Sequence, residues 1–326
     1  LLAGEGYVQH FFNYWADILR AQSRLSGGEV PRMAYLNYLA TSLRSNKPYD
    51  AFVRELVGAQ GKAWDNGAIG YYLRDTGMPL DNFAITARIF LGTRIECAQC
   101  HDHPFDKWTQ KQFFQMAAFT YGVDTVDHYD GVLLRVLKLI QERDMLARKN
   151  AKSLGDAERK VTNDETALRR KYVDRAFGDL RQPFRNTHVG SKDRKLTLPH
   201  DYQYADAKPM SVVTPATMMG QPVVAAPGTN LLSAYAHWLA SPENPRFTTV
   251  VANRLWKKVF GRGLIEPVDE LKDDTKAVNP ELMAHLEKLM VSLRYDMKAY
   301  LRVLLNTQTY QRAVSVMEIE AGAAYH

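Results

Sequence analysis

Apolar residues recur at helical spacing along most of the 326-residue chain, and this spacing is the strongest constraint on its fold. In residues 7–20, for example, Phe11, Trp15 and Ile18 fall on one face of a helix. The pattern predicts a mainly α protein. The other segments that it predicts to be helical are 31–47, 50–57, 81–90, 110–121, 245–260, 280–293 and 297–305.

Polar residues predict where several of these helices begin. Thr109 and Gln112 have the spacing of a capping box, in which each side chain bonds the other residue's backbone N–H. Residues 59–80 are rich in Gly and polar groups and predict a long loop. The other predicted caps are Asp50, Asp81, Asp296 and the pairs Asn244-Pro245 and Asn279-Pro280.

The length of the chain favours two domains. Residues 135–182 are highly charged and nearly free of Gly and Pro, which predicts a protruding helical hairpin that turns near Gly155. A solvated charged linker is the alternative. Residues 186–230 hold many Pro and Gly and predict an extended connection. We therefore expect a first helical domain at 1–125, a basic helical insertion at 126–195 and a second helical domain at 196–326.

The charge of the chain is concentrated in the insertion. The chain has 42 Lys and Arg against 36 Asp and Glu, a net charge of +6. Residues 135–185 alone hold 14 Lys and Arg against eight Asp and Glu, so the whole excess lies there. This distribution indicates one basic arm rather than a nucleic-acid-binding protein. No apolar run reaches the ~18 residues of a membrane span, and residues 1–5 do not have the pattern of a signal peptide.

The only two cysteines, Cys97 and Cys100, precede His101 in the order Cys-x-x-Cys-His. This order is the attachment motif of c-type haem. Each thiol adds to one vinyl group of the porphyrin, and the next residue presents its imidazole to the iron. The motif predicts one covalent haem c, bound through both thiols, with His101 as the proximal iron ligand.

Three alternatives use the same residues. A disulfide between Cys97 and Cys100 leaves the following histidine unexplained. A thioredoxin-like redox pair needs a βαβ context, whereas the preceding segment is predicted to be helical. A zinc site would take its ligands from Cys97, Cys100, His101 and His103, which are crowded into seven residues, although structural zinc sites use two separated pairs. Haem is the preferred interpretation.

Several stretches resemble one family. Residues 94–119, RIECAQCHDHPFDKWTQKQFFQMAAF, are similar to the planctomycete-type cytochrome-like family, whose members carry two linked domains of unknown function. NYWADILR (13–20) and NKPYDAFVREL (46–56) resemble its first domain. Three further stretches resemble its second domain: LPHDYQYADAKP (198–209), NPRFTTVVANRLWKKVFGRGLIEPVDEL (244–271) and YDMKAYLRVLLNTQTYQR (295–312).

The resemblance implies an exported, cytochrome-like protein without assigning it a reaction. It also implies that family residues precede Leu1 and follow His326, and that a further cytochrome domain often lies ahead of this region. An extracytoplasmic location, periplasmic or at the cell surface, agrees with the chemistry of attachment, because bacteria join haem to thiols outside the cytoplasm.

The sixth iron position has four candidate ligands: Met116, His10, His128 and His103. Core packing is the preferred role for Met116, and a local role in a tight turn is preferred for His103. Asp102 and Asp106 are expected to be turn or cap residues. Further haem contacts are predicted at Trp108, by packing on the porphyrin or in the core near it, and at Arg94, by pairing with a propionate.

A polar stretch in the second domain, NRLWKKVFGRGLIEP (253–267), has two interpretations. The preferred one is a buried Arg–Glu pair that joins the helix to its following loop, formed from Arg254 or Arg262 with Glu266. The alternative is a site for an anion or a sugar.

Electron transfer is the expected function, with a redox protein or neighbouring cytochrome subunit as partner, in a homo- or hetero-oligomer. The basic arm would then meet an acidic partner surface. One alternative is a haem enzyme with an open iron position, peroxidase-like or oxidative, acting on a small oxidant or a carbohydrate-derived substrate. The other is a structural subunit of a surface or a complex.

Overall fold

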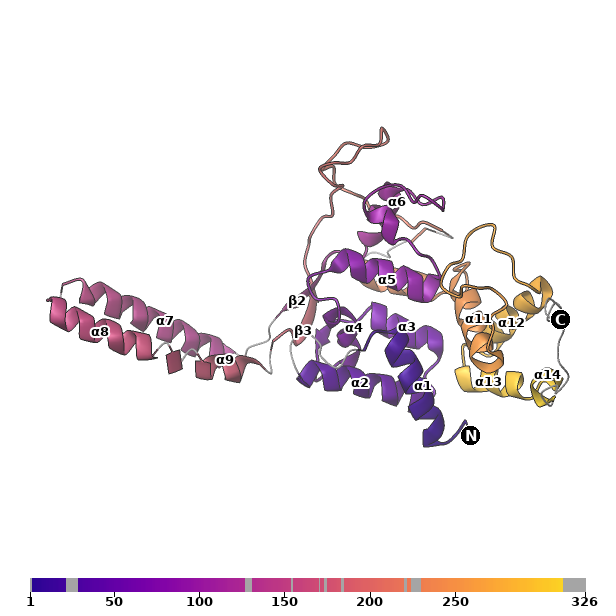
Figure 1. Cartoon of the computed structure of the whole chain (residues 1–326), viewed down its shortest axis with the longest axis horizontal. Helices are drawn as coiled ribbons and strands as arrows, with labels where there is room; N and C mark the ends of the chain where they lie inside the picture. Colours follow the sequence, from indigo (N-terminus) through magenta and orange to yellow (C-terminus); the bar gives the residue numbers. More distant parts are fainter. Residues whose placement is uncertain are drawn as a thin grey trace, which may run out of the picture.

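The structure, a computed structural model, is mainly helical, as predicted, and it also contains one small sheet (Figure 1). Two helical regions pack together, and a helical arm extends from one side. The residues that the structure describes are 2–21, 29–126, 131–153, 155–169, 171–172, 175–182, 185–219, 222–223 and 230–312. Within these ranges, no helix combines the length and apolar character needed to cross a membrane.

The first domain forms because each of its helices places large apolar side chains in a shared core. Trp15 is fully buried, and its ring centroid lies 5.2 Å from that of Tyr49 on a neighbouring helix. The helices of this domain are α1 (Glu5–Ile18), α2 (Glu29–Arg44), α3 (Tyr49–Val57), α4 (Gly70–Leu73), α5 (Pro79–Leu91) and α6 (Gln110–Ala117), with the short 3₁₀ helices η1 (Gly67–Ile69) and η2 (Glu96–Gln99).

Two predicted caps are wrong and one is confirmed. Asp50 and Asp81 lie inside the first turns of α3 and α5, whose N-caps are Pro48 and Met78. Asp50 instead pairs with Arg54 one turn later, at 2.8 Å. The capping box at α6 is present as predicted.

The prediction of a long loop at residues 59–80 is wrong. This segment holds β1 (Gly61–Lys62), η1 and α4, and its Tyr71 is fully buried with its hydroxyl 2.5 Å from the hydroxyl of Thr86. Gly70 is needed for close packing, because an added Cβ would lie 2.3 Å from the Cβ of Tyr35 on α2. The glycine therefore marks close contact between helices, which the sequence pattern does not distinguish from a loop.

A three-stranded antiparallel sheet connects the first domain to the arm, and it was not predicted. Its strand order is β1-β3-β2, where β2 is Val123–Val126 and β3 is His188–Ser191. Val126 pairs with His188, so the chain leaves and re-enters the first domain at neighbouring positions.

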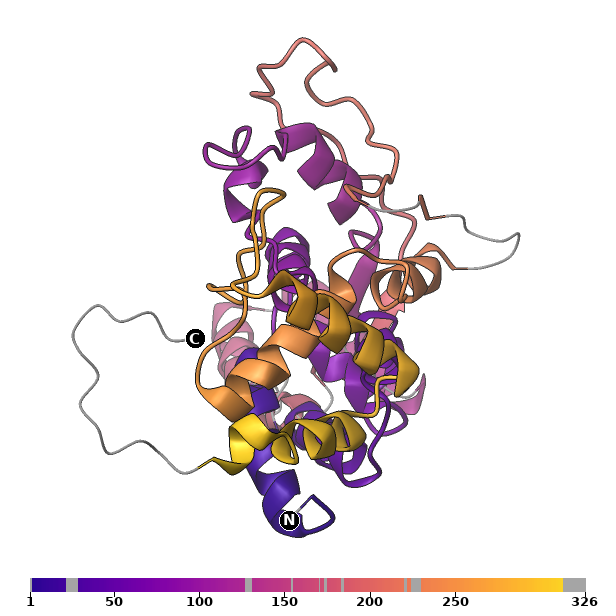
Figure 2. The ribbon, with the colours of Figure 1, turned by 90° about the vertical axis from the view of Figure 1, so that its right-hand side faces the viewer.

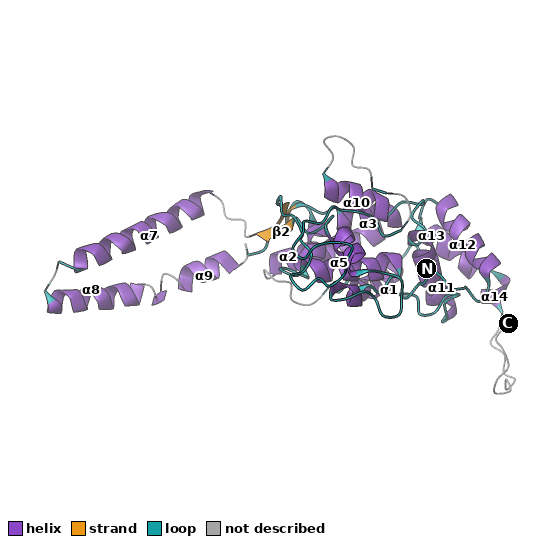
Figure 3. Cartoon of the chain, turned by 90° about the horizontal axis from the view of Figure 1, so that it is seen from above, coloured by secondary structure: helices purple, strands orange, loops and turns teal. Residues whose placement is uncertain are grey.

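Between β2 and β3, three helices form the helical arm. Its helices are α7 (Gly131–Ala151), α8 (Asp156–Arg169) and α9 (Arg175–Arg181). Figures 1 and 3 show α7 and α8 side by side, extending away from the rest of the molecule. The predicted hairpin and its turn near Gly155 are confirmed.

After β3, the linker at residues 192–219 runs without regular helix or strand and forms the outermost loop above α6 (Figure 2). Thr197 and Val212 form an isolated antiparallel bridge within it. The backbone N–H of Ala216 donates to the carbonyl of Gln115 on α6, at 3.2 Å. The prediction of an extended connection is confirmed for these residues.

The second domain packs against the first through a continuous apolar core. Phe247 stacks on Tyr49 of α3, with ring centroids 5.5 Å apart, and Tyr235 stacks on Phe119 at 5.2 Å. The helices of this domain are α10 (Leu231–Leu239), α11 (Phe247–Phe260), α12 (Pro280–Ser292), α13 (Met297–Leu305) and α14 (Gln308–Gln311).

The caps predicted at Asn279 and Asp296 are confirmed. At Asn244-Pro245 the predicted start is two residues early. The Asn244 side chain accepts from the backbone N–H of Arg246 at 3.1 Å and forms a turn before α11 begins at Phe247.

Candidate functional site

The Cys-x-x-Cys-His segment forms a single helical turn at the surface. It begins in η2 and continues through His101, whose backbone N–H donates to the Cys97 carbonyl at 3.4 Å. Cys97, Cys100 and His101 are all exposed, and both cysteines are free thiols. Residues three and four apart share one side of a helical turn, so both sulfurs and the imidazole are presented together.

The imidazole of His101 is held by its neighbour. Its Nδ1 lies 2.7 Å from the backbone carbonyl oxygen of Asp102. A carbonyl oxygen only accepts hydrogen bonds, so Nδ1 carries the proton and donates it. In the neutral imidazole, a proton on Nδ1 leaves the free electron pair on Nε2, which is the atom that would then bind a metal.

The loop that follows is fixed by hydrogen bonds to three parts of the chain. The Asp102 backbone N–H donates to the hydroxyl of Tyr204 in the linker, at 2.7 Å. The Asp102 carboxylate accepts from the backbone N–H of Gln110, at 2.8 Å. The His103 backbone N–H donates to the Trp108 carbonyl, at 2.8 Å. These contacts give the exposed turn a rigid support.

His103 and Asp106 have local contacts of the kind predicted for turn residues. The Nδ1 of His103 accepts from the backbone N–H of Phe105 at 3.2 Å, and the Asp106 carboxylate accepts from the backbone N–H of Lys107 at 2.7 Å. Phe105 itself is 78% exposed, which is unusual for a large aromatic residue.

Trp108 and Arg94 are already engaged within the protein. Trp108 is 1% exposed, and the guanidinium of Arg246 lies 5.3 Å from its ring centroid. Arg94 pairs with Asp269 at 3.0 Å and with Glu270 at 3.2 Å. Their roles as haem contacts stay predictions.

The candidates for the sixth iron position lie in different environments. Met116 is fully buried in α6, and His10 is exposed on α1. His103 is held in the turn described above, and His128 lies outside the described residues.

The zinc alternative is not supported by the arrangement of side chains. Across the described parts of the chain, no three His, Cys, Asp or Glu side chains gather closely enough to hold a metal ion. The four predicted zinc ligands therefore do not form a preassembled site.

A loop of the second domain is held beside this segment through Asp269, which was not among the predicted site residues. Asp269 accepts from Arg88 at 2.6 Å as well as from Arg94. Burial alone would raise the pKa of Asp269, but hydrogen bonds from both arginines outweigh it and hold the pKa below its ordinary value. The concentration of acidic residues in 269–274 was the available signal.

Arg246 is the central residue of the same contact. Its guanidinium donates to the hydroxyl of Thr93 at 2.8 Å and to the Leu271 carbonyl at 2.6 Å, and it pairs with Asp273 at 3.1 Å. Lys107 also pairs with Asp273. Both domains thus contribute to the position of the exposed turn.

The predicted Arg–Glu pair of the second domain is wrong. Glu266 pairs with Lys257 at 2.9 Å and accepts from the backbone N–H of Gly263. Asn253 joins the helix to its loop instead, through hydrogen bonds to the backbone of Leu264 and Ile265. Arg254 turns the other way and donates to the carbonyl of Ile89 in the first domain.

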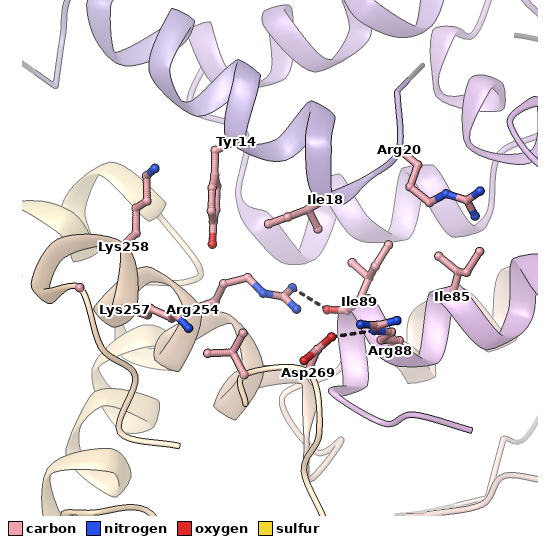
Figure 4. Close-up of a pocket in the computed structure, with 12 residues that line it drawn as sticks. Tyr14, Ile18, Arg20, Ile85, Arg88, Ile89, Arg254, Lys257, Lys258 and Asp269 are labelled. Carbon is pink, nitrogen blue, oxygen red and sulfur yellow. Dashed lines mark hydrogen bonds and ion pairs between the residues drawn. The ribbon is translucent and has the colours of Figure 1, made fainter. Parts of the chain in front are cut away.

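A cavity of about 730 Å³ opens between the two domains (Figure 4). One side is formed by α1 and α5, and the other by α11 with the loop that follows it. The residues of Cys97, Cys100 and His101 are not among those that line it.

Comparison with known families matches two parts of the chain. Residues 1–125 match the family PSCyt2, described as protein of unknown function (DUF1549), and residues 233–324 match PSD1, described as protein of unknown function (DUF1553). No curated protein matches the chain, and no solved structure does.

Proposed function

We propose that this chain, which carries both domains of the planctomycete-type two-domain family, is an exported c-type cytochrome-like protein that transfers electrons through one covalent haem. The observation that carries the proposal is the exposed turn. There, two free thiols and an imidazole whose Nδ1 is hydrogen-bonded to the Asp102 carbonyl are presented together.

The donor set fits haem c. Both thiols are exposed and free rather than joined in a disulfide. At this spacing, each can form a thioether with one vinyl group of the haem. His101 supplies the nitrogen ligand, and the Asp102 carbonyl keeps its Nδ1 protonated. When bound, the haem supplies one-electron oxidation and reduction.

The remaining residues of the segment would support and cover the group. Tyr204 and Gln110 hold Asp102 in place, so the carbonyl that orients His101 stays fixed. Phe105 is the exposed aromatic residue closest in sequence to the motif, and it offers an apolar surface to a porphyrin. The buried side chain of Trp108 anchors the loop in the core.

The exposed position of the motif suits electron transfer, because a redox partner can approach it directly. The basic arm extends into solvent and would attract an acidic partner or a neighbouring cytochrome subunit by long-range electrostatics. Location outside the cytoplasm belongs to the same proposal, since haem attachment to thiols takes place there in bacteria.

A second candidate function is a haem enzyme with an open iron position. It is favoured by the placement of the candidate sixth ligands, because Met116 is in the core and His103 is held within its own turn. Carbon monoxide distinguishes the two candidates. A spectrum that carbon monoxide does not change indicates a six-coordinate electron carrier, and a ready shift indicates an open position.

The attachment is tested by variants expressed in a host that matures c-type cytochromes. The wild-type chain should retain haem on a denaturing gel, and the Cys97→Ser/Cys100→Ser double variant should lose it. His101→Ala should keep the covalent haem but change its absorption spectrum. His237→Ala is the matched control, because the Nδ1 of His237 also lies 2.8 Å from a backbone carbonyl but no thiol accompanies it. Equal haem content in the wild type and the double variant would refute the proposal.

A further inference from the structure

Arg254 brings an uncompensated positive charge to the cavity between the two domains. The residue is 5% exposed, and its guanidinium donates to the Ile89 carbonyl at 2.6 Å. Among the residues that the structure describes, no carboxylate pairs with it. A guanidinium has five N–H donors, and a single neutral acceptor leaves most of this capacity unused.

Two further donors accompany Arg254. Figure 4 shows the hydroxyl of Tyr14 on the side of Arg254, and within the described chain it has no hydrogen-bond partner. Burial raises the pKa of Tyr14 to about 12, against the opposing effect of the nearby Arg254 charge, so the phenol keeps its proton. The Nζ of Lys258 lies 4.8 Å from the Tyr14 ring centroid.

The other charged residues that line the cavity each have a partner of opposite charge. Arg20 pairs with Asp75 at 3.2 Å, and Lys257 pairs with Glu266 at 2.9 Å. Asp269 is the acidic residue of the lining, and it already accepts hydrogen bonds from Arg88 and Arg94. The two charges without an acidic partner in the described chain are therefore those of Arg254 and Lys258, and the cavity has a net positive character.

The α1 and α5 side of the cavity carries an apolar wall, formed by Ile18, Ile85 and Ile89, and Val268 adds an apolar side chain on the α11 side. The volume of about 730 Å³ is within the usual range for a small-molecule site. An inorganic anion alone would leave this apolar wall in contact with water. A ligand that matches both the positive charges and the apolar wall carries one anionic group on an apolar body.

We propose that the cavity binds a small amphiphilic anion, whose carboxylate, sulfonate or phosphate group is held by Arg254, Tyr14 and Lys258 and whose apolar body packs on the isoleucine wall. The ligand would contact helices α1 and α5 of the first domain and α11 of the second, so its binding would stabilise their association. This inference does not depend on the haem proposal, because the cavity and the exposed turn share no residue.

The proposal is tested by isothermal titration calorimetry of the full chain with 8-anilinonaphthalene-1-sulfonate, a sulfonate on an aromatic body. The wild-type chain should bind one equivalent, with an affinity that falls as salt concentration rises. Arg254→Gln should weaken binding by about tenfold, and Lys258→Gln and Tyr14→Phe by about threefold each. Asp269→Asn should strengthen it, because the substitution removes the acidic residue of the lining.

Two controls separate the anionic group from the apolar wall. Arg262→Gln, at an exposed arginine just beyond α11, should leave the affinity unchanged. N-phenyl-1-naphthylamine, a neutral counterpart of the probe, should bind the wild type and Arg254→Gln equally. If Arg254→Gln fails to fold, the exposed Lys258→Gln and the isosteric Tyr14→Phe decide the question. The proposal is overturned if neither of these weakens sulfonate binding, or if the wild-type chain binds no equivalent.

Discussion

The hydroxyl of Tyr204 accepts a hydrogen bond from the backbone N–H of Asp102, and the two atoms lie 2.7 Å apart although 102 residues separate them in sequence. Tyr204 belongs to the linker, and Asp102 follows the last residue of the Cys-x-x-Cys-His motif. The linker therefore supports the exposed turn in addition to connecting the two domains.

Tyr204→Phe should destabilise this turn. The substitution leaves a backbone donor without its partner, which costs about 1 kcal/mol of unfolding free energy. Urea denaturation measures the loss, and hydrogen exchange should show faster exchange of the Asp102 amide. Tyr172→Phe, at a 63% exposed position in the arm, is the control and should change neither quantity. Equal exchange rates in the wild type and Tyr204→Phe would show that the hydrogen bond does not support the turn.

Gly92→Ala should destabilise the contact between the domains. Gly92 ends α5 with φ of +58°, and an added Cβ would lie 2.7 Å from the Cδ1 of Leu271 and 2.9 Å from the Cγ2 of Val250. Gly77→Ala is a matched control, because Gly77 has φ of +80° but nothing within 4 Å of the added atom. Each variant should lose about 1 kcal/mol of unfolding free energy, because alanine is strained in the left-handed backbone conformation. Gly92→Ala should lose roughly a further 1–3 kcal/mol, because the added Cβ overpacks the contact between the domains.

Thermal denaturation of the two glycine variants measures this difference. The melting temperature of Gly92→Ala should lie clearly below that of Gly77→Ala. If the two variants melt together, the second domain does not pack against the end of α5 as described.

Asp269→Asn should weaken the same contact in a pH-dependent way. Hydrogen bonds from Arg88 and Arg94 lower the pKa of Asp269 in the folded protein, despite its partial burial. The stabilisation is therefore complete above the unfolded pKa of about 4 and is lost as the pH falls through the lower folded pKa. At pH 7 the variant should lose about 1 kcal/mol of unfolding free energy. The loss is small because both arginines are partly exposed, which weakens their ion pairs with Asp269.

Urea titrations at neutral and acidic pH test this sign. The stability difference between the wild type and Asp269→Asn should be largest near neutral pH and should shrink as the pH falls below about 4. Asp274→Asn, at an exposed neighbouring position, should show no such difference. A stability difference between the wild type and Asp269→Asn that grows in acid would contradict the assigned role of Asp269.

The features that could be predicted from the sequence are local ones. Thr109 and Gln112 are three residues apart, and the capping box that they form needs only that spacing. Asn279 and Asp296 are caps for the same reason. The exposed turn of the motif was also predictable, because its two cysteines and histidine lie within five residues of sequence.

The features that could not be predicted depend on residues far apart in sequence. The sheet pairs β1 with β3 across more than a hundred residues, and neither strand is long enough to show alternation. Arg254 was one of two candidates for a pair with the nearby Glu266, yet its acceptor is the carbonyl of Ile89, 165 residues away. Spacing along the chain does not reveal which of two acceptors a long side chain reaches.

The helical arm should be separable from the rest of the molecule. Val126 of β2 pairs with His188 of β3, so the strands remain neighbours when residues 131–182 are replaced by a Gly-Ser connection of about four residues. The shortened chain should lose helical circular dichroism while its melting temperature changes by less than about 2 °C. Aggregation or a lower melting temperature would show that the arm supports the first domain.

The central claim is that a porphyrin is bonded through sulfur to Cys97 and Cys100. The most direct test is the intact mass of the full chain purified from a host that matures c-type cytochromes, measured together with a pyridine haemochrome spectrum. A mass equal to the polypeptide plus one haem, with the spectrum of a haem bearing two thioethers, is the predicted result. A colourless protein with the mass of the polypeptide alone would contradict it.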